Sequence, residues 1–127
     1  MIRSGRSVVV LCLLLASCGP APSTSIDYEH PQQKIQAVNL FSNFVNHPNV
    51  ADRDHTRKVL EVTGHVLRME PGHVVVGSAE KGEVWLAFEG GTIPAGISVG
   101  QEITVVGQCK GMNGHVVVDQ CRLMPKS

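Results

Sequence analysis

The stretch KVLEVTGHV (residues 58–66) alternates apolar and polar side chains along its length. In an extended chain, Leu60, Val62 and Val66 therefore lie on one face, and the polar residues between them lie on the other. Gly64 interrupts the apolar face at its middle, where the missing Cβ permits a bulge or a sharp bend. We expect a strand with one buried face that bends at Gly64.

Four further strands are predicted downstream, over residues 73–77, 83–88, 101–109 and 115–124. The connector between the third and fourth strands has room for one helical turn at IPAGI (residues 93–97). Asn113 and Gly114 both tolerate positive φ, so they predict a two-residue hairpin turn that sets Met112 opposite His115. Gly107 sits in the fourth strand as Gly64 sits in the first.

The segment before the strands is predicted to be one amphipathic helix. Apolar residues recur at helical spacing between residues 35 and 45. Pro31 suits the first turn of a helix, and Pro48 ends the pattern because it pushes its preceding residue out of the α region. We expect a helix from Gln32 to Asn46 within a capping segment of residues 32–50. The residues ADRDHTRK (51–58) then form a polar lead-in to the first strand.

The N-terminus has the pattern of an export signal. Arg3 and Arg6 precede a nine-residue apolar run at 8–16, whereas a membrane-spanning helix needs about 20 apolar residues. The run ends in LASC (residues 15–18), which resembles a lipobox. That resemblance implies cleavage after residue 17, a diacylglyceryl thioether on Cys18 and acylation of the new N-terminus. An ordinary signal peptide with an incidental cysteine is the alternative.

These features predict how the chain is divided and where it works. We expect a signal peptide at 1–17, a lipidated flexible tether at 18–31 and a folded domain that is exported and held at a membrane. Gly19, next to the lipobox cysteine, resembles the residue found in lipoproteins that are sent to the outer membrane. We therefore expect the domain to face the periplasm from the outer membrane.

Together, these segments resemble the tRNA_anti-like family of OB-fold bacterial lipoproteins. The resemblance covers about residues 40–123, and its most specific parts are V-x-G-x-V in KVLEVTGHV and the pattern of GQEITVVGQCKG (residues 100–111). The family implies a mainly β protein: a five-stranded Greek-key barrel, here over residues 57–124, preceded by one amphipathic α-helix. The chain departs from the family in VWLAF (residues 84–88), where relatives often carry a cysteine, and at His55, where a tyrosine is expected.

The candidate ligand face lies on the second and third strands, between the first and last hairpin loops, as in other OB-folds. By alternation, Trp85 points outward there and could stack on a sugar or a base, or anchor a protein partner. His73 and His115 border the two loops, with Lys110 nearby, and could form a ligand rim. The alternative is that the chain covers Trp85 itself and that the histidines are ordinary loop residues.

Cys109 and Cys121 raise the question of a disulfide, which an exported compartment permits. Regular pairing sets Cys109 opposite Val118 and Cys121 opposite Val106, a separation of roughly 10 Å against the 7 Å or less that a bridge needs. A bulge at Asp119–Gln120 would bring the thiols closer. A disulfide and two free thiols both stay open.

No metal, cofactor or catalytic site is expected. The six histidines show no H-x-x-x-H or H-x-H spacing, and no C-x-x-C pair occurs. The cysteines lack a neighbouring base, and Glu80 and Glu83 flank a turn as solvated charges usually do. We therefore expect a binding protein and not an enzyme.

The expected function is a lipid-anchored envelope module that binds a protein partner or a glycan. Net charge is zero, and the residues from Ala51 onward show no basic footprint for nucleic acid. A nucleic-acid-binding OB domain is the first alternative, suggested by the family name. A haem or metal carrier, by analogy with the OB-fold haem chaperone, is the second. The H-x-x-x-Y motif of that chaperone is missing, because the only tyrosine, Tyr28, precedes every histidine.

Overall fold

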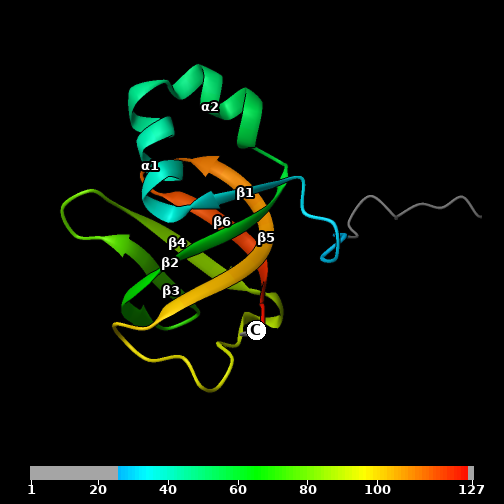
Figure 1. The fold of residues 1–127 in the computed structure, drawn as a ribbon, viewed down its shortest axis with the longest axis vertical. Coiled ribbons are helices and arrows are strands. Elements are labelled where there is room, and N and C mark those ends of the chain that lie inside the picture. The colour runs from blue at the N-terminus through cyan, green and yellow to red at the C-terminus, as the bar shows by residue number, and fades with distance from the viewer. Residues whose placement is uncertain (1–25, 126–127) are drawn as a thin grey trace, which may run out of the picture.

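Five strands close into a barrel in the computed structural model, which describes residues 26–125 (Figure 1). They are β2 (Val59–Glu70), β3 (His73–Ser78), β4 (Gly82–Phe88), β5 (Glu102–Met112) and β6 (Val116–Leu123). The order around the barrel is β2-β3-β4-β6-β5, and β5 pairs back onto β2. Among these pairings only that of β4 with β6 is parallel. The predicted five-stranded OB-fold barrel is confirmed.

Gly64 lies where β2 changes partners. Up to His65 the strand pairs with β5, and from Val66 onward it pairs with β3. A Cβ on Gly64 would lie 3.0 Å from the Cβ of Ala37 and 3.2 Å from the Cβ of Val76. The glycine is therefore needed because two other elements pack directly against the strand at the point where it turns.

The residues before the barrel form more elements than the single helix expected from the sequence. Residues 33–36 form a short strand, β1 (Gln33–Gln36), which pairs in parallel with β2, so the predicted helix is wrong over its first turn. Helix α1 (Ala37–Asn46) follows and buries Leu40 and Phe44. Both α1 and the helix after it lie across one end of the barrel (Figure 1).

That further helix, α2 (Pro48–His55), occupies the segment predicted to be a polar lead-in. Pro48 does end the pattern of α1, but it also starts α2, because proline at the first helical position loses no hydrogen bond. The face that α2 buries consists of Ala51 and His55. Because histidine is polar, His55 does not count as part of an apolar stripe in the sequence. The sequence pattern therefore does not predict α2 as an amphipathic helix.

His55 joins the three N-terminal elements. Its Nδ1 donates to Gln33 Oε1 of β1 at 2.7 Å, and its Nε2 accepts from Asn43 Nδ2 of α1 at 3.2 Å. The residue is only 8% exposed, and burial lowers the pKa of its imidazole. Both ring nitrogens of the neutral form are thus satisfied.

The hairpin and connector differ in detail from the prediction. Met112 pairs with Val116, so the loop between β5 and β6 has three residues (113–115), and Gly114 has a φ of 83°. In the connector, residues 93–97 do not form the expected helical turn, and the chain instead turns at Glu89–Gly91, where Gly90 and Gly91 each have a φ of 76°.

The expected bulge in β6 is present, one residue further along. Gln108 pairs with Asp119 and Val106 with Arg122, so Gln120 and Cys121 both lie opposite Gly107. A Cβ on Gly107 would lie 2.8 Å from Cys121 Sγ. The glycine makes room for the extra residue, and the bulge lets the Cys121 side chain enter the core.

The last part of the predicted tether lies on the barrel. The Tyr28 hydroxyl donates to the Gln120 carbonyl oxygen at 2.6 Å, and the Arg122 guanidinium carbon lies 4.0 Å from the Tyr28 ring centroid. The predicted lipobox, with Cys18, lies outside the described residues.

Candidate functional site

The outer face of β3, β4 and β6 carries a stack of three aromatic rings. Trp85 lies at the centre of β4, and His73 on β3 and His115 just before β6 lie diagonally across from it. The His73 ring centroid is 4.2 Å from that of Trp85 with 14° between the planes, and the His115 centroid is 3.8 Å away at 20°. Because β3 and β6 flank β4 on opposite sides, the two imidazoles cover the two faces of the indole. We call these three residues the aromatic stack.

Alternation along β4 positions this stack. Val84, Leu86 and Phe88 point into the core, and Trp85 therefore points outward, where it is half-buried. Within residues 26–125, the imidazoles of His73 and His115 stack on this side chain. The edge of the indole, rather than either face, is thus the part that meets solvent.

Two polar atoms of the stack lack hydrogen-bond partners. Trp85 Nε1 is buried, and no acceptor in the described residues reaches it. His73 Nε2 is also buried; it lies 3.1 Å from Glu70 Oε1, within ion-pair distance, but the approach does not have hydrogen-bond geometry. Buried donors without partners are uncommon in folded proteins, and a bound group could reach this indole N–H only if the side chains around it moved.

An ion-pair network borders the stack. Arg68 of β2 donates from its two terminal nitrogens to both carboxylate oxygens of Glu83, at 3.1 Å each, and from Nε to Glu70 at 2.7 Å. The hydrogen bond from Arg68 is the main cause that lowers the pKa of Glu70, and the same bonds raise the pKa of Arg68. Val75 points to this outer face, yet it is fully buried. The face is therefore a packed layer and not an open groove.

Lys110, the fourth residue of the predicted rim, is not part of the stack. It is exposed in the irregular part of β5 between Cys109 and Gly111. A Cβ on Gly111 would lie 3.0 Å from Thr56 Oγ1, so this part of β5 lies near the end of α2. The loop residues Asn113 and Gly114 place His115 beside Trp85.

A family sequence profile matches residues 4–122, nearly the whole chain. The chain belongs to the tRNA_anti-like family. Its fold is similar to that of a lipoprotein from Klebsiella pneumoniae described as a candidate nucleic acid-binding protein, with 14% identity and a TM-score of 0.60 over 72% of this chain and 91% of that one. It is also similar to a chain of the S. pombe Stn1-Ten1 complex, with 17% identity and a TM-score of 0.49 over 80% and 81% of the two chains. No curated protein matches the sequence.

All three residues of the aromatic stack in this tRNA_anti-like protein were predicted from the sequence, but the arginine that borders the stack was not. Trp85, His73 and His115 were predicted from strand alternation and loop position. Arg68 was not, because the pairing across three strands that brings it to Glu83 has no signal in the local sequence.

The two cysteines of the barrel are free thiols, and both are buried. Cys121 Sγ donates to the Val118 carbonyl oxygen at 3.3 Å, and burial raises the pKa of both thiols. Of the two alternatives left open by the sequence, the structure contains the free pair.

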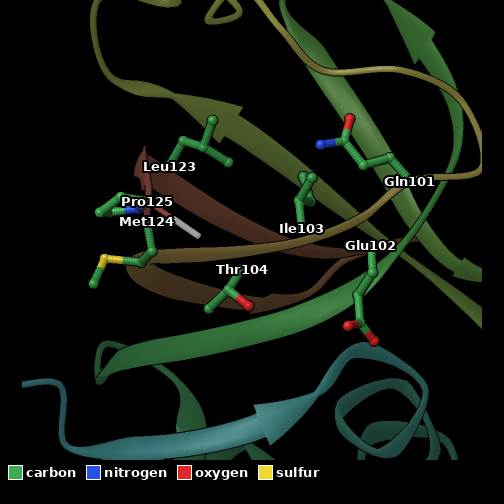
Figure 2. A pocket seen from close by; sticks show the side chains of 7 residues that line it. All are labelled: Gln101, Glu102, Ile103, Thr104, Leu123, Met124 and Pro125. Carbon is green, nitrogen blue, oxygen red and sulfur yellow. The ribbon is translucent and has the colours of Figure 1, made fainter. Parts of the chain in front are cut away.

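A separate hollow of about 360 Å³ lies beside β5 and the end of the chain (Figure 2). It is lined by residues 101–104 and 123–125 and does not reach the stack. Figure 2 shows Glu102 and Thr104 pointing away from Ile103, as alternation on β5 requires. Glu102 is the one charged residue in this lining.

Within residues 26–125, no three His, Cys, Asp or Glu side chains gather in a geometry that could hold a metal ion. In the same part of the chain, no helix is long and apolar enough to cross a membrane.

Proposed function

We propose that this protein is a lipid-anchored module of the bacterial envelope that binds a protein partner through the outer face of β3 and β4. The lipobox-like residues 15–18 support export and attachment through Cys18, and the Klebsiella structure similar in fold is also described as a lipoprotein. We place the module on the outer membrane, facing the periplasm. The role is binding and not catalysis.

The aromatic stack is the observation on which the choice of ligand class rests. Sugars and bases bind to tryptophan by stacking on a free ring face, and both faces of Trp85 are taken by imidazoles. What remains is the edge of a half-buried tryptophan, beside the arginine of the ion-pair network. Tryptophan and arginine in a packed surrounding layer are typical of binding hot spots between proteins.

Nucleic-acid binding is the second candidate, because the Klebsiella protein is described as a candidate nucleic acid-binding lipoprotein. Charge argues against it here. Residues 18–127 contain nine Lys and Arg against eleven Asp and Glu, whereas single-stranded nucleic acid is normally held in a positive groove with several free rings.

Crosslinking in intact envelopes tests the protein-binding proposal. Cells expressing the lipidated, tagged full chain are crosslinked, and the captured proteins are compared between wild type, His73→Ala and Trp85→Phe. His65→Ala is the matched control, because His65 is exposed on β2 and takes no part in the stack. Partners lost with the two stack variants and kept with His65→Ala would support the proposal. A partner profile unchanged by all three would refute it.

Fluorescence anisotropy with labelled single-stranded RNA and DNA tests the second candidate function, nucleic-acid binding. We expect no saturable binding at micromolar protein. Saturable binding that weakens steeply between low and moderate salt would show that the ligand is a nucleic acid and not a protein. Counterion release makes binding to nucleic acid salt-dependent.

A further inference from the structure

A groove of about 260 Å³ lies beside the aromatic stack, where three elements meet. Phe41 of α1 lies on one side, the turn between β3 and β4 on the second, and the loop between β5 and β6 on the third. Its larger lining side chains are Phe41, Glu80, Glu83 and His115. His115 belongs to both this groove and the stack, so one partner could contact both.

The position of the Phe41 side of the groove is set by a glycine. The Phe41 ring lies against the backbone of Gly82 so closely that a Cβ there would be 2.0 Å from Phe41 Cδ2. Gly82 has a φ of 134°, which residues other than glycine rarely adopt. The ring is half-buried and packs on the core, so it forms a preformed apolar side of the groove.

The turn between β3 and β4 orders its backbone and places Glu80 at the rim of the groove. The backbone N–H groups of Glu80 and Lys81 both donate to Ser78 Oγ, at 3.2 Å each. Glu80 is exposed, and its carboxylate makes no ion pair within the described residues. Glu83, in contrast, is already paired with Arg68. Glu80 is therefore the carboxylate that is free to pair with an incoming cation.

We propose that this groove receives an arginine side chain of the partner protein. This rests on the proposed function and gives the chemistry of the partner. The flat guanidinium stacks on the Phe41 ring, as it does on other aromatic faces, and pairs with Glu80. The small excess of acidic residues in the mature chain, eleven Asp and Glu against nine Lys and Arg over residues 18–127, favours a basic partner and disfavours a phosphate in the groove.

Titration with a small peptide pair tests the arginine site. The probes are acetyl-Gly-Arg-Gly-amide and its citrulline counterpart, which has the same shape and no charge. The protein is the mature chain, residues 18–127, with Cys18→Ser so that it stays unlipidated. Amide chemical shifts are followed by NMR at peptide concentrations up to about 10 mM, because a single side chain is expected to bind in the millimolar range.

We expect the arginine peptide to give saturable shifts at Gly82, Gly114 and His115, with much smaller shifts from the citrulline peptide. Glu80→Gln should weaken binding by about two- to fivefold, the range of an exposed ion pair. Glu102→Gln, the same change at an exposed residue outside the groove, should leave binding unchanged. Equal effects of the two peptides, no saturable shift, or no effect of Glu80→Gln would overturn the proposal.

Failure here is distinguishable from failure of the proposed function. His73 and Trp85 do not line the groove. If His73→Ala and Trp85→Phe abolish capture in envelopes while the arginine peptide does not bind, the protein-binding face stands and the arginine site is wrong.

Discussion

The indole ring of Trp85 lies 3.8 Å from the imidazole ring of His115, centroid to centroid, although Trp85 belongs to β4 and His115 to the loop between β5 and β6. With His73 on the other face, the stack joins β3, β4 and β6 on the outside of the barrel. Aromatic pairs of this kind contribute about 0.5–1.5 kcal/mol beyond the area that they bury. The stack therefore both stiffens the face and determines which part of the indole a partner can reach.

Removal of one imidazole should uncover one face of the only tryptophan. We expect His115→Ala to shift the fluorescence emission to longer wavelength, to increase quenching by acrylamide, and to lower the free energy of unfolding by about 1 kcal/mol. His65→Ala should leave the emission wavelength, the quenching and the free energy of unfolding unchanged, because His65 is exposed and is not part of the stack. If the two variants had the same spectra, Trp85 would not be covered as described.

Gly82 should tolerate alanine far less well than other glycines with positive φ. A Cβ at position 82 would overlap the Phe41 ring, whereas nothing lies within 4 Å of a Cβ at Gly90, where φ is 76°. Backbone strain alone costs about 1–2 kcal/mol at Gly90, in the left-handed region, and about 1–3 kcal/mol at Gly82, where the overlap adds about 1–3 kcal/mol. We expect urea denaturation to show a loss of about 3 kcal/mol for Gly82→Ala and about 1 kcal/mol for Gly90→Ala. Equal losses would mean that the Phe41 ring is not held against the backbone.

The sequence was a better guide to the barrel than to its N-terminal cap. Strands with period-two alternation, such as β4 with Trp85 facing outward, carry their own signal, since each apolar residue marks the core. The strand β1 has no such signal: Ile35 fits the helical stripe of α1, and only pairing with β2, distant in the chain, makes it extended. Local patterns do not contain that information.

The groove and the ion-pair network were also beyond prediction from the sequence. Phe41, Glu80 and His115 are widely separated in the chain, and they meet because α1 closes over the turn between β3 and β4. In the sequence, Gly82 looks like an ordinary turn residue. In the structure, the Phe41 ring packs against it and leaves no room for a Cβ. A close approach between elements of this kind follows from topology, and not from residue type.

Stability should fall as the pH falls below the ordinary range of histidine, because of His55. Burial lowers the pKa of this imidazole in the folded state, so the unfolded chain takes up a proton first, starting near its ordinary pKa of about 6.5. The stability that neutral His55 contributes is fully present above a pH of about 6.5, and it is lost as the pH falls to the pKa of the folded state. We expect urea midpoints to decrease from pH 7.5 to pH 5.5.

The matched comparison for this effect is His47→Ala, since His47 is exposed at the start of α2. His55→Ala should be less stable than wild type at pH 7.5, because Gln33 and Asn43 lose their partner, and it should show a flatter dependence on pH. His47→Ala should keep the wild-type slope. A wild-type slope in His55→Ala would assign the pH dependence to another group.

Cys109 and Cys121 should be unreactive until the barrel unfolds. The thiolate is the reactive form, and both thiols are buried with raised pKa values. In native protein at pH 8, Ellman's reagent should react with neither, whereas an exposed thiol introduced by Thr92→Cys should react at once. In guanidinium without reductant, two thiols of the Cys18→Ser mature chain should react together. If they reacted only after a reductant was added, the chain would contain a disulfide, and the packing of Cys121 against Gly107 would have to differ from that described.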